Sequence, residues 1–126
     1  IQHGTASRAM VAVMKRGEIW VGNLNPARGR ETGKIRPVLI FHADELLGAE
    51  MPLVIVLPLT SRLHSGAPRF RITVPARDRL LVESQIMTDQ PRALDRTRIT
   101  DGPLTRLTET ELAAVEQSLL AVLGMM

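Results

Sequence analysis

The strongest constraint on the fold is a succession of short, apolar, strand-like segments, each closed by residues that favour turns. Segment 53–60 (LVIVLPLT) is typical, and its proline favours a bulge or an edge position. Short strands at turn-marked spacing are characteristic of a small barrel, so we predict a mainly β fold. The expected strands are 18–24, 36–41, 53–60, 69–74, 81–88 and a short one at 104–107, with a helical turn at 43–48.

Periodicity predicts which faces of these elements are buried. Apolar and polar residues alternate through 69–74, as in a half-buried strand. Thr108 and Glu111 stand at the spacing of a capping box, and they open the long C-terminal helix that Gly124 ends. We expect this helix to pack against the barrel. The inward residues are Phe70, Ile72 and Val74 on the strand, with Arg69, Arg71 and Thr73 outward, and Leu112, Val115, Leu119, Val122 and Leu123 on the helix.

A chain of 126 residues predicts one domain. Residues 1–13 have no strong period and lack the apolar core of a signal peptide. We interpret them as an extension, either artificial or poorly ordered, and 14–126 as the folded domain. The apolar runs are too short to span a bilayer, and the absence of cysteine suits a reducing cytoplasm. Most basic side chains are arginines, whose planar fork suits phosphate.

The stretch 28–41 joins a loop of glycines and charged residues to an apolar strand that begins at Arg36. If 36–41 and 53–60 are antiparallel neighbours, Arg36 and Thr60 lie at the same end of the sheet, because the two positions are centred on residue 48. An arginine and a hydroxyl that converge there would suit a phosphate. The alternatives are an arginine that closes the sheet end and a threonine that bonds to backbone.

Candidate acid–base residues were sought among the histidines. His64 lies in the loop after Thr60 and could approach a leaving oxygen, or it could be an ordinary exposed loop histidine. The sequence shows no metal-ligand spacing, no G-x-S-x-G segment and no Walker loop, so no cofactor is predicted. Arginines at 62, 69, 71, 77 and 79 could neutralise phosphates, or they could form a solvated face.

Four segments resemble the MazF/PemK toxin family: KRGEIW (15–20), NPARGRETGKIRPVLI (25–40), PLTS (58–61) and DQPRALDRTRI (89–99). Their order and spacing match, as does the closing helix. The resemblance implies a small SH3-like barrel of the CcdB/PemK type, usually a homodimer. It also implies sequence-specific, ribosome-independent and metal-free cleavage of single-stranded RNA, and a partner antitoxin that blocks the RNA site with an acidic, flexible segment.

The resemblance also implies roles for individual residues. Arg36 and Thr60 match the family's catalytic pair, and Glu31 matches the acidic residue of the loop. Arg30 stands where a small serine is more usual, and Pro91 replaces an aliphatic residue, so both could change the RNA sequence that is read. The RNA-binding residues are expected to be Arg28, Arg30, Lys34, Ser61, Arg62 and Gln90.

The reaction can be derived from the chemistry of RNA. The 2′-hydroxyl can attack the adjacent phosphate and expel the 5′-oxygen, and Arg36 would stabilise the charge that develops. Arginine keeps its proton in proteins, so the identity of the general base stays open. Segments 36–41 and 53–60 are apolar at nearly every position, which predicts that a second subunit covers one face in a symmetric homodimer.

Two other classes of protein were weighed. A non-catalytic CcdB-like barrel that poisons DNA gyrase is the alternative reading. CcdB-like proteins lack the RETGKIRP loop (30–37), and their Trp-Gly-Ile tail is replaced here by Gly124-Met125-Met126. A peptide or methyl-lysine reader needs an aromatic cage, which Trp20, Phe41 and Phe70 are too scattered to supply.

Overall fold

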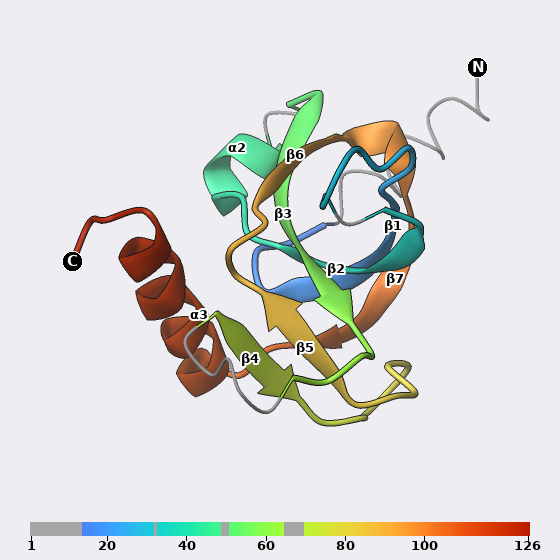
Figure 1. Ribbon diagram of the computed structural model, residues 1–126. Helices are drawn as coiled ribbons and strands as arrows, with labels where there is room; N and C mark the ends of the chain where they lie inside the picture. Colours follow the sequence, from blue (N-terminus) through green and yellow to red (C-terminus); the bar gives the residue numbers. More distant parts are fainter. Residues whose placement is uncertain (1–13, 32, 49–50, 65–69) are drawn as a thin grey trace, which may run out of the picture.

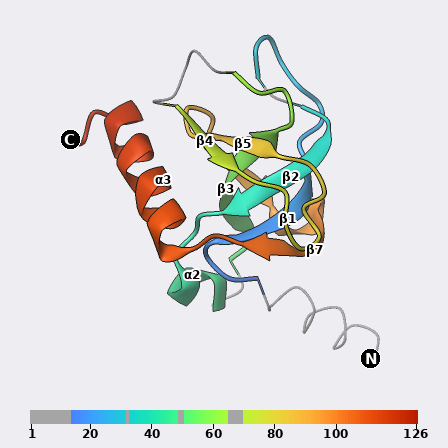
Figure 2. The same ribbon diagram turned by 90° about the horizontal axis from the view of Figure 1, so that it is seen from below.

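In the computed structural model, which describes residues 14–31, 33–48, 51–64 and 70–126, the strands form one antiparallel sheet that curls on itself. The C-terminal helix α3 lies outside the curl, beside β4, in both views of the chain (Figures 1 and 2). The prediction for residues 1–13 falls outside the described residues. The elements are β1 (Glu18–Asn23), β2 (Ile35–Ile40), α2 (Asp44–Gly48), β3 (Leu53–Thr60), β4 (Arg71–Val74), β5 (Ser84–Met87), β6 (Arg92–Asp95), η1 (Arg96–Arg98), β7 (Ile99–Arg106) and α3 (Glu109–Val122).

Strand β3 is the centre of the sheet, whose order is β4-β5-β3-β2-β1-β7 with β6 also on β3. One side of β3 pairs with β2. The other side pairs first with β6, through Leu53–Val56, and then with β5, through Leu59 and Thr60. Pro58 lies in the interval between these two pairings. Because β3 has neighbours on both sides, the edge position considered for Pro58 is wrong.

The pairing of β2 with β3 confirms the antiparallel arrangement predicted for these segments. The register pairs Val38 with Pro58 and Leu39 with Leu57. Continued by two residues, it sets Arg36 opposite Thr60 at the end of both strands. Directly opposed residues of an antiparallel pair present their side chains on the same face.

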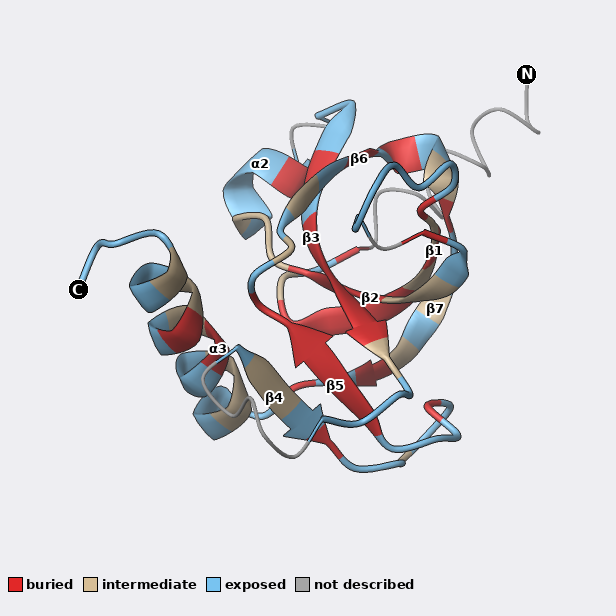
Figure 3. Cartoon of the chain, in the orientation of Figure 1, coloured by how far each residue is buried: buried red, intermediate tan, exposed pale blue. Residues whose placement is uncertain are grey.

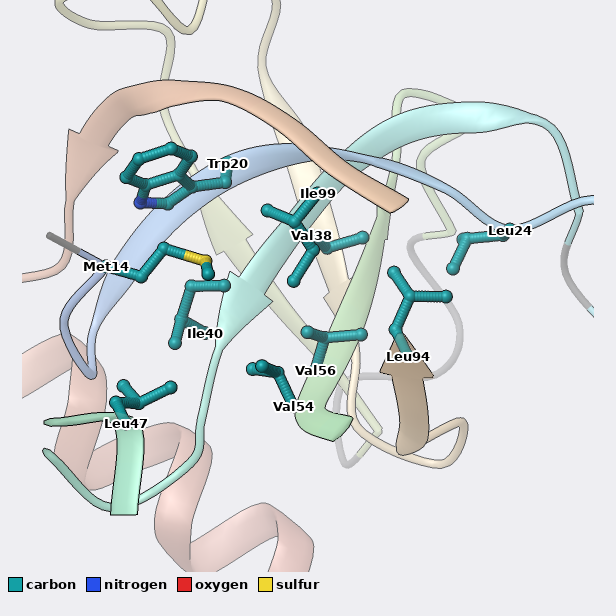
Figure 4. Close-up of a cluster of buried hydrophobic side chains, with 10 residues drawn as sticks. All are labelled: Met14, Trp20, Leu24, Val38, Ile40, Leu47, Val54, Val56, Leu94 and Ile99. Atoms are coloured by element: carbon teal, nitrogen blue, oxygen red, sulfur yellow. The ribbon is translucent and has the colours of Figure 1, made fainter. Parts of the chain in front are cut away.

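Two apolar clusters fill the two faces of the sheet. The first contains Val38 and Ile40 from β2 and is shown in Figure 4. The second contains Leu39, Leu57 and Leu59 and is covered by residues of β4, β5 and α3. Figure 3 shows that β5 and most of β3 are buried. The apolar run of β2 from Val38 to Ile40 and the second half of β3 are therefore buried within one chain. Leu53 and Ile55, in the first half of β3, stay 49% and 37% exposed.

Most of the predicted elements are present, with shifted ends. β3 has the predicted bounds, and the capping box at Thr108 and Glu111 is confirmed. β7 is longer than predicted, and β6 and η1 were missed. The prediction that Phe70 faces inward is wrong, because its exposed fraction is 37%.

Helix α3 buries less of its apolar stripe than predicted. Val115 is buried, whereas Leu123 is 54% exposed. The polar Ser118 of the same helix is buried instead. Its hydroxyl lies 2.6 Å from that of Thr88, the residue that follows β5. This buried hydrogen bond, with one hydroxyl satisfying the other, ties the helix to the sheet.

Candidate active site

A pocket of about 820 Å³ opens at the end of the sheet where β2 begins and β3 ends. Its ionisable side chains include five cations and no carboxylate among the described residues. Arg36 and Thr60 lie in it, as do three of the six residues expected to bind RNA. The lining consists of Lys34, Ile35, Arg36, Pro37, Leu59, Thr60, Ser61, Arg62, His64, Arg71, Arg79, Leu80, Leu81, Val82, Ser84, Met87 and Leu104.

Arg36 is held at the pocket by backbone carbonyls. Its Nε donates to the carbonyl of Gly33 at 2.9 Å, and its Nη1 donates to that of Leu59 at 3.2 Å. Partial burial lowers the pKa of the Arg36 guanidinium below its ordinary value, because desolvation disfavours the charged form. These bonds fix the plane of the guanidinium without neutralising it, so its charge is available to an anion.

Thr60 belongs to a polar row that crosses four strands. It stands opposite Gln85 of β5, and Gln85 stands opposite Thr73 of β4. With Arg36 on the other side of Thr60, the row runs over β2, β3, β5 and β4. The Thr60 hydroxyl accepts a hydrogen bond from the Arg62 N–H at 3.1 Å, which turns the chain at the end of β3.

Two arginines beyond β2 and β3 add positive charge to the pocket. Arg71 is only 16% exposed at its side chain and bonds Asp89 at 2.6 Å, so the prediction that it faces solvent is wrong. Its buried Nε has no hydrogen-bond partner among the residues that the structure describes. Arg79, in the turn after β4, bonds Asp101 at 2.8 Å. Each of these cations has a carboxylate partner, whereas Arg36 bonds only neutral carbonyls in the contacts described here.

The loop between β1 and β2 carries three predicted residues that do not line the pocket: Arg28, Arg30 and Glu31, all exposed. Gln90 also lies outside the lining, with its Nε2 3.8 Å from the sulfur of Met87. The structure thus gathers Arg36, Thr60, Lys34, Ser61 and Arg62, and it leaves the other four apart from them.

We call residues 24–34 the β1–β2 loop. Hydrogen bonds restrain its two ends, at Leu24 and Asn25 and at Lys34. Lys34 N–H donates to Oδ1 of Asn25 at 2.8 Å. Arg92 donates to the carbonyl of Leu24 at 2.8 Å, and Arg98 donates to that of Asn25. The segment DQPRALDRTRI (89–99) therefore contributes two arginines, Arg92 and Arg98, whose hydrogen bonds restrain the start of the loop.

The sequence analysis missed two features of the site. The first is an apolar rim of Ile35, Leu81 and Val82, which are 65%, 83% and 57% exposed. The second is Gln85, a buried amide in β5 that no motif in the sequence marks. Among the described residues, no three His, Cys, Asp or Glu side chains gather closely enough to hold a metal ion.

A curled sheet with an arginine and a hydroxyl opposed at one end, surrounded by further cations, can bind a phosphodiester and stabilise added negative charge. This fold and residues 15–123 match the family described as PemK-like, MazF-like toxins of type II toxin–antitoxin systems, and the chain belongs to that family. The match does not favour the CcdB-like alternative.

Several solved structures are similar to this chain. A crystal structure of MazF from Deinococcus radiodurans has 32% identity and a TM-score of 0.77, over 90% of this chain and 98% of that one. A MazE–MazF complex from the same organism has 29% identity and a TM-score of 0.71, over 90% and 98%. An endoribonuclease in complex with its cognate antitoxin, from mycobacterial species, has 16% identity and a TM-score of 0.70, over 90% and 98%, which supports the fold alone. No described helix is long and apolar enough to cross a membrane.

Proposed function

We propose that this toxin is an endoribonuclease that cleaves single-stranded RNA at specific sequences. The observation that carries the proposal is the opposition of Arg36 and Thr60 in a pocket whose ionisable lining is cationic. A scissile phosphodiester is the ligand that this charge and this hydrogen-bonding capacity suit. Ser61, Arg62 and Lys34 would contact the flanking phosphates and bases.

The reaction uses the nucleophile that RNA supplies. The 2′-oxygen attacks phosphorus, the bond from phosphorus to the 5′-oxygen breaks, and the products carry a 2′,3′-cyclic phosphate and a 5′-hydroxyl. Arg36 stabilises the negative charge on the pentacoordinate transition state. Thr60 orients a phosphate oxygen with its hydroxyl. Arg28, Arg30, Glu31 and Gln90 lie outside the pocket lining, so in this proposal they act on nucleotides beyond the cut, with Glu31 no longer placed at the reacting atoms.

We further propose two macromolecular partners. An antitoxin with an acidic, flexible segment would cover the pocket, because its carboxylates match the arginines and its apolar residues match the rim of Ile35, Leu81 and Val82. A second copy of the chain would form a symmetric homodimer. Support for the dimer comes from the apolar side chains that α3 and the residues after it leave exposed, including Leu120, Leu123 and Met126.

The direct test is to incubate the protein with a defined RNA, map each cut and identify the ends. Cleavage should stop when the nucleotide before the cut is 2′-deoxy, and chelators should leave the rate unchanged. Arg36→Ala should lower kcat on the order of a hundredfold, as removal of an oxyanion donor does. Arg16→Ala is the matched control, since Arg16 bonds Glu116 away from the pocket. Normal cleavage by Arg36→Ala would refute the proposal.

A further inference from the structure

Gln85 is a buried amide in the middle of β5, with an exposed fraction of 7%. A buried amide is costly unless its donors and acceptor are satisfied. Its Oε1 accepts the backbone N–H of His64 at 2.9 Å, and its Nε2 donates to the backbone carbonyl of His64 at 3.3 Å. The same Nε2 lies 3.4 Å from the hydroxyl of Thr73. One side chain therefore satisfies both backbone groups of His64.

The backbone pairing of β3 with β5 ends at Thr60 and Gln85, and the two hydrogen bonds from the Gln85 side chain extend it to His64. In an antiparallel pair, two residues exchange both an N–H and a C=O bond. The side chain of Gln85 makes the same exchange with His64, four residues beyond the end of β3. His64 is thereby fixed at the wall of the pocket that contains Arg36 and Thr60. His64 is an exposed loop residue, as the alternative reading expected, but its backbone is held by Gln85.

His64 also differs chemically from the rest of the pocket. Imidazole is the side chain whose charge ordinarily changes between pH 5 and 8. The other ionisable groups that line the pocket are Lys34, Arg36, Arg62, Arg71 and Arg79. Arginine does not give up its proton in proteins. Among the described lining residues, only His64 and Lys34 carry ionisable groups that ordinarily give up a proton, and an ordinary imidazole does so closer to neutral pH than an ordinary ammonium.

We infer that His64 is the general acid of the cleavage and that Gln85 is the positioning residue that holds it at the pocket. This inference rests on the proposed endoribonuclease function. As the 2′-oxygen bonds to phosphorus and its proton passes to water, the bond to the 5′-oxygen breaks, and the imidazolium gives its proton to that oxygen.

The first experiment compares two substrates. One is an ordinary RNA, and the other carries sulfur in place of the bridging 5′-oxygen at the cut, because a thiolate leaves without a proton. His64→Ala should lower kcat about a hundredfold on the ordinary RNA, the lower range for a general acid. On the sulfur-bridged RNA it should cleave like the wild type.

The second experiment tests Gln85. Gln85→Met keeps the volume of the side chain and removes both bonds to His64, so kcat on the ordinary RNA should fall by about tenfold. In the double variant with His64→Ala, Gln85→Met should cause no further loss, because it acts through the imidazole. Thr73→Val is the control, since it removes one partner of Gln85 and leaves the bonds to His64 intact. Melting temperatures identify any variant that fails to fold. If Gln85→Met fails to fold, the comparison of the two substrates with His64→Ala still tests whether His64 is the general acid.

The outcomes separate the inference from the proposed function. A wild-type protein that leaves all RNA intact refutes the function. If the wild type cleaves and His64→Ala cleaves equally well, the function stands and the inference is overturned. A slow His64→Ala that the sulfur-bridged RNA does not rescue also overturns it, because the imidazole would then act on the 2′-hydroxyl. If Gln85→Met lowers kcat by the same factor in the wild type and in His64→Ala, Gln85 does not act through His64 and the positioning role is overturned.

Discussion

Arg77 and Glu111 are joined by two parallel hydrogen bonds, with Nη2 2.6 Å from Oε1 and Nη1 2.8 Å from Oε2. The pair connects the turn after β4 to the first turn of α3. Arg77 also donates from Nε to the Thr105 hydroxyl, at 3.2 Å, and from Nη2 to the carbonyl of Arg106, at 2.8 Å. The hydrogen bond from Arg77 is the largest cause that lowers the pKa of Glu111, and the bond to Glu111 in turn raises that of Arg77.

This pair predicts an acid-sensitive contribution to stability. Because the folded pKa of Glu111 is lowered, the pair stabilises the fold above the ordinary carboxyl pKa, and the contribution is lost as pH falls through the folded value. Glu111→Gln should cost about 1–2 kcal/mol of unfolding free energy at neutral pH, a range reduced for partial exposure. Urea unfolding should show the variant and the wild type converging in acid, and a gap independent of pH would contradict the assignment.

A second prediction concerns the support beneath the β1–β2 loop. Arg98→Ala removes the bond to the carbonyl of Asn25, so the loop should open more often. Trypsin should then cut faster after the exposed Arg28 and Arg30, and the melting temperature should fall by a few degrees at most. Arg79→Ala, which removes an exposed ion pair elsewhere, is the control. Equal digestion rates in all three proteins would show that Arg98 does not restrain the loop.

A third prediction concerns Thr60. Thr60→Val removes the hydroxyl and its hydrogen bond from Arg62, at similar side-chain volume. Activity should fall by about tenfold, less than in Arg36→Ala, because orientation is lost and charge stabilisation is kept. Thr60→Ser keeps the hydroxyl and should stay near wild type. A loss in Thr60→Ser as large as that in Thr60→Val would assign the role to the methyl group instead.

The proposed homodimer gives a fourth prediction. Sedimentation at micromolar concentration should yield twice the 13.9 kDa mass of one chain. The exposed apolar residues of α3 and the C-terminus would then leave water on association. A monomer at that concentration would rule the dimer out.

The proposed inhibitor gives a fifth prediction. An acidic peptide with bulky apolar residues should raise KM for RNA and leave kcat unchanged, because both ligands would occupy the pocket. Inhibition should weaken as salt rises, since arginine–carboxylate attraction is screened. Inhibition that does not depend on RNA concentration would place the peptide elsewhere.

The main strands and the C-terminal helix could be predicted from the sequence because apolar runs, turn residues and a capping box mark them locally. The centring of Arg36 and Thr60 on residue 48 agrees with the β2–β3 register, which pairs Val38 with Pro58 and sets Arg36 opposite Thr60 when it is continued by two residues. β6 was missed because RALD is short and polar, and its strand form depends on pairing with the first half of β3. Phe70 was misplaced because alternation identifies two faces of a strand and does not say how far along it the burial extends.

The interior of the site was harder to foresee. Gln85 bonds backbone groups 21 residues away, which no spacing in the sequence marks. Arg71 reads as an outward charge on an alternating strand, yet its partner Asp89 holds it against the sheet. The resemblance placed Glu31 near the chemistry, whereas the structure sets that exposed carboxylate outside the pocket lining. Contacts between distant segments decide the positions of Gln85 and Arg71, and a sequence carries no local trace of such contacts.

The polar row across β2, β3, β5 and β4 determines how much of the chain must be synthesised before the pocket can form. Its members, Arg36, Thr60, Gln85 and Thr73, come from four separate strands, and the pocket lining draws on the same four strands, so no single hairpin contains the pocket. A slip of one residue in any pairing would turn the row to the opposite face and dismantle it. If the proposed endoribonuclease function holds, the nascent chain cannot cleave RNA until β5, the last strand of the row to be made, has emerged and paired. An antitoxin made alongside it has that interval in which to be ready.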